Sequence, residues 1–281
     1  MLSRRTLLLG GIGAVGAGAA AAVVIGPRRV GYEVGIVESP DHRVPASGVQ
    51  VEEHTLDSAH MPEPVGWAIA RPSVPATGIV LCLHGRNSDH RAAFDKMFLH
   101  DVVAALQLPL AIIGVDGGQS SYWHERVDGR DPMAMVMNEL VPAIDNTLDA
   151  TLPYAVLGWS MGGYGALLFG ATHPARFCAV AAASPALWQH ADDASAGAFD
   201  DEADFERHDV FEMRDRLANV TVRVDCGTDD GFLDVAKNFA QGLPKQNLGS
   251  FTEGFHDDAY WRSIAPAQLT TIAKATQSAS P

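Results

Sequence analysis

The feature that most constrains the fold of this chain is a series of short apolar runs, each followed by a segment of helical periodicity. The runs have the length of strands and show no apolar–polar alternation, as is typical of strands buried on both faces. Strands that alternate with helices in this way form a mostly parallel sheet with helices on both faces, so the sequence predicts an α/β fold. The predicted strand and helix pairs are Ile79–Leu83 with Ala92–Leu106, Leu110–Val115 with Met133–Leu148, Tyr154–Leu157 with Met161–Thr172, Phe177–Ala183 with Val210–Leu217, Val220–Asp225 with Leu233–Leu243, and Ser250–Phe255 with Ile264–Ala275.

The segment before these pairs is predicted to add an antiparallel edge to the sheet. Its short β-like stretches are Tyr32–Val37, Val49–Thr55 and Val65–Ala70, separated by Pro and Gly. Residues 30–281 are then expected to form one domain. Residues 188–207, which follow the Phe177–Ala183 strand, break the alternation and are rich in Asp and Glu. They predict an acidic insertion, either a solvated loop or a lid over a site.

The first 26 residues are expected to direct the chain out of the cytoplasm. Arg4 and Arg5 precede an apolar, charge-free run from Thr6 to Ile25, and the pattern resembles a twin-arginine signal. The run is also long enough for an uncleaved anchor. A Gly-x-Gly-x-x-Gly match at Gly11–Gly16 does not indicate a dinucleotide site, because Gly26 and Pro27 end the helix too early. The chain is therefore predicted to be secreted or to reside in the cell envelope.

Charge and cysteine content exclude several classes of function. The formal net charge is −14, so a phosphate backbone or an anionic membrane is a poor partner. Cys82, Cys178 and Cys226 are few and scattered, which argues against disulfide frameworks and zinc knuckles. No metal or cofactor is implied by the sequence.

A nucleophilic serine is indicated by the motif Gly158-Trp159-Ser160-Met161-Gly162. The apolar strand that ends at Leu157 runs into the motif, and a helix is predicted to begin at Met161. This strand–turn–helix setting holds a serine hydroxyl exposed above the sheet. It also places the backbone N–H of Met161 at a helix N-terminus, where it can stabilise an oxyanion. The sequence thus predicts Ser160 as the nucleophile.

The other groups that an activated serine needs occur at the ends of later strands. Of the eleven histidines only His256 lies after His208, and it directly follows the last predicted strand. An acid is expected after Val220–Asp225, where Asp229 and Asp230 both occur. In hydrolases of this kind the order along the chain is serine, acid, histidine. The loop that begins at His84 is expected to supply a second oxyanion N–H, with His84 itself in a structural hydrogen-bonding role.

These motifs resemble an α/β-hydrolase family that groups esterase D, an S-formylglutathione hydrolase, with the mycobacterial mycolyltransferase antigens. The resemblance extends from about Gly78 to the end of the chain and implies Asp230 as the acid and Arg86 as the second oxyanion residue. Arg86 stands where relatives often carry leucine, and the cysteine of the S-formylglutathione loop is absent. The resemblance is carried by the segments around Ser160, Asp230 and His256. Residues expected to line the site and contact substrate are His84, Asp116, Trp123 and Trp159.

The sequence therefore predicts a secreted serine esterase that acts through an acyl-enzyme on small-molecule or lipid esters. Acyl transfer to a sugar or lipid alcohol of the cell envelope is an alternative with the same chemistry. A non-catalytic envelope-binding protein on a hydrolase scaffold is an alternative of another class, and the co-occurrence of Ser160, Asp230 and His256 argues against it.

Overall fold

A computed structural model describes residues 27–279 in two units, which divide between Val37 and Glu38. The described part of the first unit contains helix α1 (Pro27–Glu33) and a turn. The predicted strand Tyr32–Val37 is therefore wrong. Gly35 has a φ of +69°, and Val34 and Ile36 are 62% and 81% exposed. Alternating apolar residues favour a strand only where a sheet covers one of its faces, and in this unit they form a turn instead.

The second unit contains an eight-stranded sheet with the strand order β1-β2-β4-β3-β5-β6-β7-β8. Strand β2 pairs antiparallel with β1 and β4, and every other neighbouring pair is parallel. The predicted parallel sheet with an antiparallel edge is confirmed. The strands are β1 (Val51–Leu56), β2 (Val65–Ala70), β3 (Gly78–Leu83), β4 (Leu110–Val115), β5 (Tyr154–Trp159), β6 (Phe177–Ala183), β7 (Thr221–Gly227) and β8 (Phe251–Thr252).

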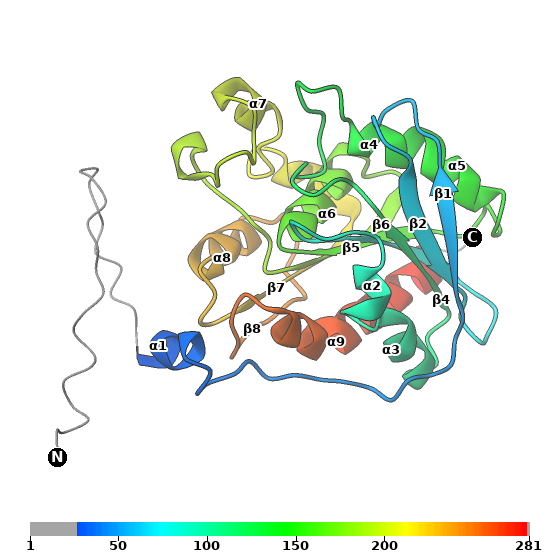
Figure 1. Ribbon diagram of the computed structural model, residues 1–281, viewed down its shortest axis with the longest axis horizontal. Coiled ribbons are helices and arrows are strands. Elements are labelled where there is room, and N and C mark those ends of the chain that lie inside the picture. The colour runs from blue at the N-terminus through cyan, green and yellow to red at the C-terminus, as the bar shows by residue number, and fades with distance from the viewer. Residues whose placement is uncertain (1–26, 280–281) are drawn as a thin grey trace, which may run out of the picture. The chain divides into compact units, whose positions relative to one another are not determined.

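Helices cover both faces of the sheet, as Figure 1 shows. One core lies between the sheet and α6, α8 and the α4–α5 region, and the other lies between the sheet and α2, α3 and α9. This double coverage explains why β3, β4 and β5 are apolar and buried along their whole length. The helices are α2 (Ala92–Asp95), α3 (Leu99–Ala105), α4 (Pro132–Met135), α5 (Val141–Asp145), α6 (Met161–Thr172), α7 (Glu202–Arg207), α8 (Leu233–Gln241) and α9 (Asp258–Ala279).

Several helices differ from the predicted ones. The helix expected over Ala92–Leu106 is split into α2 and α3, because Phe98 has a φ of +52°. A π-helical turn, Val136–Leu140, separates α4 from α5, since Pro142 lacks the N–H that an unbroken α-helix needs. In place of the helix at Val210–Leu217, a 3₁₀ helix covers Arg214–Asn219. Helix α9 begins six residues before the predicted Ile264, at Asp258, and continues through Pro266.

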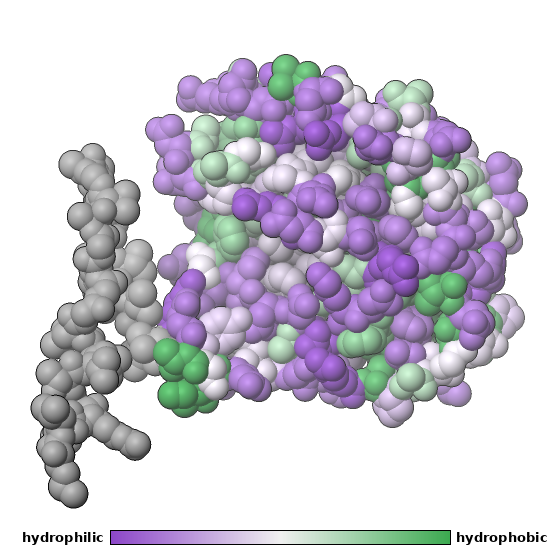
Figure 2. Space-filling model, viewed as in Figure 1, coloured by the Kyte–Doolittle hydropathy of each residue, from purple (hydrophilic) through white to green (hydrophobic). Residues whose placement is uncertain are grey.

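The surface of the described residues is largely polar on the face that Figure 2 shows. This agrees with the acidic net charge of the chain. Within residues 27–279, no helix is both long and apolar enough to cross a bilayer. The predicted signal segment, residues 1–26, lies outside the described part of the chain.

Candidate active site

Ser160 lies at the sharp turn between the central strand β5 and helix α6. Its φ of +55° and ψ of −118° are unfavourable for a residue with a side chain, and they turn the hydroxyl away from the strand. The turn is possible because of two glycines. A Cβ on Gly158 would lie 2.0 Å from the carbonyl oxygen of Gly162, and one on Gly162 would lie 1.8 Å from that of Leu83. The local structure predicted for the Gly-x-Ser-x-Gly motif is thus present.

His256 and Asp230 complete a line of hydrogen bonds from this hydroxyl. The Nε2 atom of His256 lies 2.9 Å from the Oγ of Ser160, and its Nδ1 atom lies 2.8 Å from the Oδ2 of Asp230. Asp230 follows β7, and His256 lies between β8 and α9. Because β5, β7 and β8 run parallel, their carboxyl ends carry these three residues to one edge of the sheet.

Asp230 is held as a buried carboxylate. Its side chain has no exposed surface, and its Oδ1 accepts the N–H of Phe232 at 2.9 Å. Burial by itself would raise the pKa of Asp230, but the hydrogen bond and charge of His256 and the Phe232 N–H hold that pKa below its usual value. The neighbouring Asp229 donates its backbone N–H to the carbonyl of Gly254 at 2.9 Å. Of the two adjacent acids, the structure brings Asp230 to His256.

The two predicted oxyanion residues lie at the start of α6 and on the loop after β3. Met161 is the first residue of α6, so its N–H has no acceptor within the helix. Arg86 is exposed on the loop, and strand β3 lies beside β5 with Leu83 opposite Gly158. The preceding loop residue, Gly85, is so close to Trp159 that an added Cβ would lie 3.2 Å from its ring. The loop therefore passes next to the nucleophile turn.

Comparison with known sequences gives the family. The model of the Esterase family matches residues 58–272, which is more than half of the chain. The chain belongs to this esterase family. The membership confirms the predicted class of enzyme, that of the carboxylic ester hydrolases, and the matched residues include strands β2 to β8 and the three residues at the sheet edge.

Individual relatives agree with this family. A segment of the esterase is 36% identical over 88 residues to S-formylglutathione hydrolase of Paracoccus denitrificans, and the match spans 29% of this chain and 32% of that protein. Among solved structures, an S-formylglutathione hydrolase from Agrobacterium tumefaciens has a TM-score of 0.68 at 17% identity, covering 83% of this chain and 98% of its own. A ferulic acid esterase has a TM-score of 0.67 at 22% identity, covering 79% and 97%. The predicted α/β-hydrolase fold is confirmed.

Three of the four residues predicted to contact substrate are buried in the esterase. His84 and Trp159 are 1% and 3% exposed, and Trp123 has no exposed surface. His84 joins two loops: its Nδ1 donates to the Gly85 carbonyl at 2.8 Å, and its Nε2 accepts the N–H of Gly117 at 3.1 Å. Its expected structural role therefore agrees with its position. Only Asp116, whose side chain is 36% exposed, offers substantial surface to a substrate.

Aromatic side chains that the sequence analysis did not single out lie beside His256. The rings of Phe232 and Trp261 are 5.3 Å and 5.1 Å from the imidazole, and Trp188 contacts Phe232 at 5.7 Å. Phe232 and Trp188 are half-buried, so part of each residue is accessible to solvent. Phe232 directly precedes α8 and Trp188 belongs to the acidic insertion, and no local pattern in the sequence connects these two segments.

Ser39 is a further residue near the site that no sequence motif indicated. It is 7% exposed, and its hydroxyl accepts the N–H of Phe255 and donates to the Oδ2 of Asp257, each at 2.8 Å. These two residues flank His256. Asp257 also accepts the Tyr260 N–H at 2.8 Å through its Oδ1 and so caps α9. Ser39 thus holds both sides of the loop that carries the imidazole.

Ser39→Ala is expected to lower kcat of the esterase by about tenfold with little change in KM, because a small displacement of the imidazole weakens proton transfer more than substrate binding. Steady-state kinetics with a p-nitrophenyl ester measure both constants. Ser47→Ala is the matched control, since Ser47 lies on the same segment but donates to Asp101 at 2.7 Å, away from His256. Equal kinetics for the two variants would contradict a positioning role for Ser39.

Proposed function

We propose that this chain hydrolyses carboxylic esters through an acyl-enzyme formed on Ser160. The observation that carries the proposal is the line of hydrogen bonds from Ser160 through His256 to the buried Asp230. A serine hydroxyl is a weak nucleophile, and a neutral imidazole within hydrogen-bond distance can accept its proton as it attacks. The strained backbone at Ser160, which exposes the hydroxyl, supports the same role.

In the first half-reaction the Oγ of Ser160 attacks the ester carbonyl while the Nε2 of His256 takes its proton. The N–H groups of Met161 and Arg86 stabilise the oxyanion of the tetrahedral intermediate. His256 then protonates the leaving alcohol, and the acyl group remains on Ser160. In the second half-reaction His256 removes a proton from water, which attacks the acyl-enzyme and releases the acid. Asp230 keeps the imidazole in the required tautomer and stabilises its positive charge.

The exposure of the site supports water as the acyl acceptor. The side chain of His256 is 31% exposed, and Ser160 is also partly exposed, so water reaches the acyl-enzyme. A transferase that protects its acyl group from water needs a closed site. Hydrolysis is therefore proposed ahead of acyl transfer to an envelope alcohol.

The rings beside His256 support an ester with an apolar or aromatic portion. The exposed parts of Phe232 and Trp188 offer an apolar surface next to the imidazole. Aromatic side chains bind flat apolar groups well because they contribute large area and ring–ring contacts. One structural neighbour is a ferulic acid esterase, whose name describes an aromatic acid. We propose aryl and medium-chain acyl esters as the substrate class.

The proposed function is tested with p-nitrophenyl esters of increasing acyl length and with methyl cinnamate. Rapid mixing is expected to show a burst of nitrophenol equal to the enzyme concentration, and mass spectrometry of the quenched protein should find one acyl group on Ser160. Added glycerol distinguishes the alternatives, because a transferase would form glyceryl ester in preference to free acid. Absence of both burst and turnover would favour a non-catalytic binding protein.

We further propose that the chain is exported through its arginine pair. Changing Arg4 and Arg5 together to lysine is expected to retain the precursor in the cytoplasm with its esterase activity intact, since the signal lies outside residues 58–272 that match the family. Cell fractionation with an antibody measures the distribution. Normal export of the Lys–Lys variant would instead assign the segment to the general secretory route or to an anchor.

A further inference from the structure

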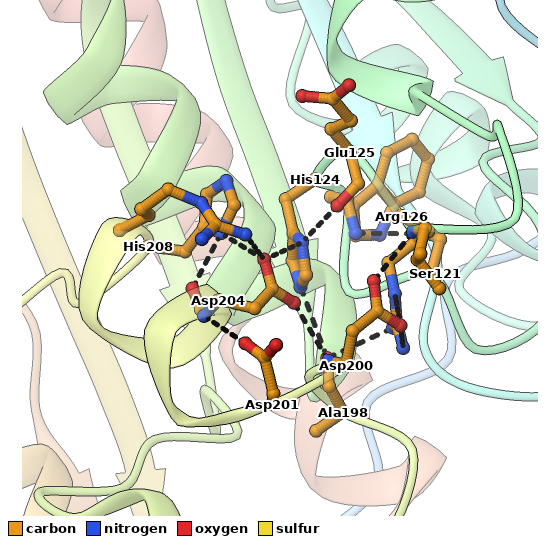
Figure 3. A network of polar contacts seen from close by, with 12 residues as sticks. Ser121, His124, Glu125, Arg126, Ala198, Asp200, Asp201, Asp204 and His208 are labelled. Atoms are coloured by element: carbon orange, nitrogen blue, oxygen red, sulfur yellow. Dashed lines mark hydrogen bonds and ion pairs between the residues drawn. The ribbon is translucent and has the colours of Figure 1, made fainter.

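A second group of polar side chains lies apart from the three residues of the proposed active site. It consists of His124, Asp204 and His208, here called the His–Asp–His cluster. His124 lies on the loop between β4 and α4, whereas Asp204 lies on α7 in the acidic insertion and His208 directly follows that helix. Asp204 and His208 are four residues apart, which places them on the same side of a helical turn. Figure 3 shows the carboxylate of Asp204 beside both imidazoles, whose rings are stacked with centroids 4.3 Å apart.

The cluster is compact and largely shielded from water. One ligand atom from each residue can be chosen so that all three lie within 4.8 Å of one another. The Oδ1 of Asp204 lies 3.0 Å from the Nδ1 of His208 and 3.8 Å from the Nδ1 of His124. The side chains of His124 and Asp204 are each 1% exposed, and that of His208 is 19% exposed.

His124 meets more hydrogen-bond acceptors than a neutral imidazole can satisfy. Its Nε2 lies 3.1 Å from the carbonyl oxygen of Ala198, and its Nδ1 lies 2.9 Å from that of Glu125. Carbonyl oxygens only accept, and a neutral ring has a single N–H. One ring nitrogen therefore directs its lone pair at oxygen atoms, an arrangement that a bound cation would stabilise.

We propose that the His–Asp–His cluster binds one divalent transition-metal ion of the zinc class. Two imidazoles and a carboxylate form a donor set that zinc prefers. With Nδ1 of His124 as the ligand, its Nε2–H donates to the Ala198 carbonyl, which is the outer hydrogen bond that metal-binding histidines usually make. The carbonyl oxygen of Glu125 is near enough to Nδ1 to supply a fourth ligand.

To bind one ion, the ligand atoms must come to similar separations, and the two imidazole rings, now stacked with centroids 4.3 Å and planes 27° apart, must tilt until their lone pairs meet at one point. Ligand atoms around a tetrahedral zinc ion are about 3.4 Å apart, given bonds of about 2.1 Å. The separations of the Oδ1 of Asp204 from the Nδ1 atoms of His208 and His124, 3.0 Å and 3.8 Å, lie on either side of that value. Access from solvent is available, because a cavity of about 270 Å³ is lined by both His124 and His208.

The ion would fasten the acidic insertion to the loop that precedes α4. That loop carries Tyr122 and Trp123, and Trp123 packs against His84 behind the nucleophile turn. Tyr164, one turn after Ser160 on α6, donates its hydroxyl to the carbonyl of His208 at 2.8 Å. The metal therefore acts on the position of the insertion and on stability, and no step of the ester hydrolysis proposed above passes through it.

The test begins with the purified full-length chain, stripped of metal with a chelator and titrated with Zn²⁺ against a chromophoric zinc indicator. One equivalent is expected to bind with a dissociation constant below 1 μM, on the order of what a three-ligand protein site achieves. Co²⁺ in place of Zn²⁺ should give the strong visible absorption of a four-coordinate ion. Thermal unfolding should shift upward with Zn²⁺, because a ligand that binds only the folded state stabilises it.

Variants locate the ion. His208→Gln and Asp204→Asn preserve shape and hydrogen bonding, and each is expected to weaken Zn²⁺ binding at least about 100-fold, more than the loss of an outer partner. Arg207→Gln should strengthen it about two- to fivefold, because the exposed Arg207 now holds the Oδ1 of Asp204 at 3.0 Å. His173→Gln is the control, since His173 lines the same cavity outside the cluster. Absence of Zn²⁺ binding, or equal affinity in His208→Gln and the unaltered chain, would overturn the proposal and leave a hydrogen-bonded network.

Discussion

Ser160→Ala is expected to lower kcat for a p-nitrophenyl ester by about 10⁶-fold and to abolish labelling by a fluorophosphonate. The proposed reaction has no second route, because every covalent step passes through the Oγ of Ser160. The variant should fold normally, since the backbone hydrogen bonds of the turn do not involve the hydroxyl. In that turn the N–H of Ser160 donates to the carbonyl of Ala183, and the N–H of Ala186 donates to the carbonyl of Ser160, each at 3.0 Å.

The matched control for this prediction is Ser278→Ala. Ser278 is exposed near the end of α9, and its hydroxyl donates to the carbonyl of Lys274 at 2.9 Å. Its variant should label and turn over as the unaltered chain does. Gel fluorescence and initial rates measure both properties. If Ser160→Ala retained labelling, the nucleophile would be another residue and the serine-esterase proposal would fail.

Asp230→Asn is expected to lower kcat by about 10⁴-fold, the effect seen when a triad carboxylate becomes an amide. The Oδ2 of Asp230 lies 2.8 Å from Nδ1 of His256 and so selects the tautomer that leaves Nε2 free to accept the serine proton. An asparagine can present its NH₂ group instead, which stabilises the opposite tautomer. KM should change much less, because Asp230 is buried and does not meet the substrate.

Asp229→Asn changes the adjacent acid on the same loop and leaves the hydrogen bond between Asp230 and His256 in place. The backbone N–H of Asp229, bonded to the carbonyl of Gly254 at 2.9 Å, is unchanged by the substitution. The rate is therefore expected to stay within about tenfold of that of the unaltered chain. The reverse ranking of the two variants would transfer the orienting role to Asp229. Near-normal rates in both would leave His256 without a carboxylate partner and contradict the triad.

The sheet could be predicted from the sequence because its central strands are buried on both faces. The strands Leu110–Val115 and Phe177–Ala183 were predicted with the bounds that the structure shows, since a continuous apolar run of this length is typical of a strand buried on both faces. Helices were less predictable because single residues break them. A positive φ at Phe98 and the missing N–H of Pro142 interrupt segments whose apolar periodicity continues. The prediction of a strand at Tyr32–Val37 was wrong because alternating apolar residues form a strand only where a neighbouring strand is present to pair with.

The residues at the sheet edge were predictable for a topological reason. Ser160, Asp230 and His256 each follow a parallel strand, so their positions in sequence imply proximity in space. Ser39 offered no such signal, because a single serine before the sheet contacts a loop near the other end of the chain. The same holds for His124, whose partners are Asp204 of the acidic insertion and His208, which directly follows it. The spacing of Asp204 and His208 could have drawn attention to that pair.

The order in which the three proposed triad residues occur has a consequence for biosynthesis. The imidazole lies on a loop that is held by Ser39 near one end of the described chain and is followed directly by α9 at the other. Helix α9 packs across the face of the sheet formed by β3, β5, β6 and β7, so the loop has its support only after this helix has docked. A growing chain contains the Ser160 hydroxyl long before it contains its base. If the proposed triad is correct, esterase activity requires both of these segments in place, and it is expected to report completed chains in a refolding or translation assay.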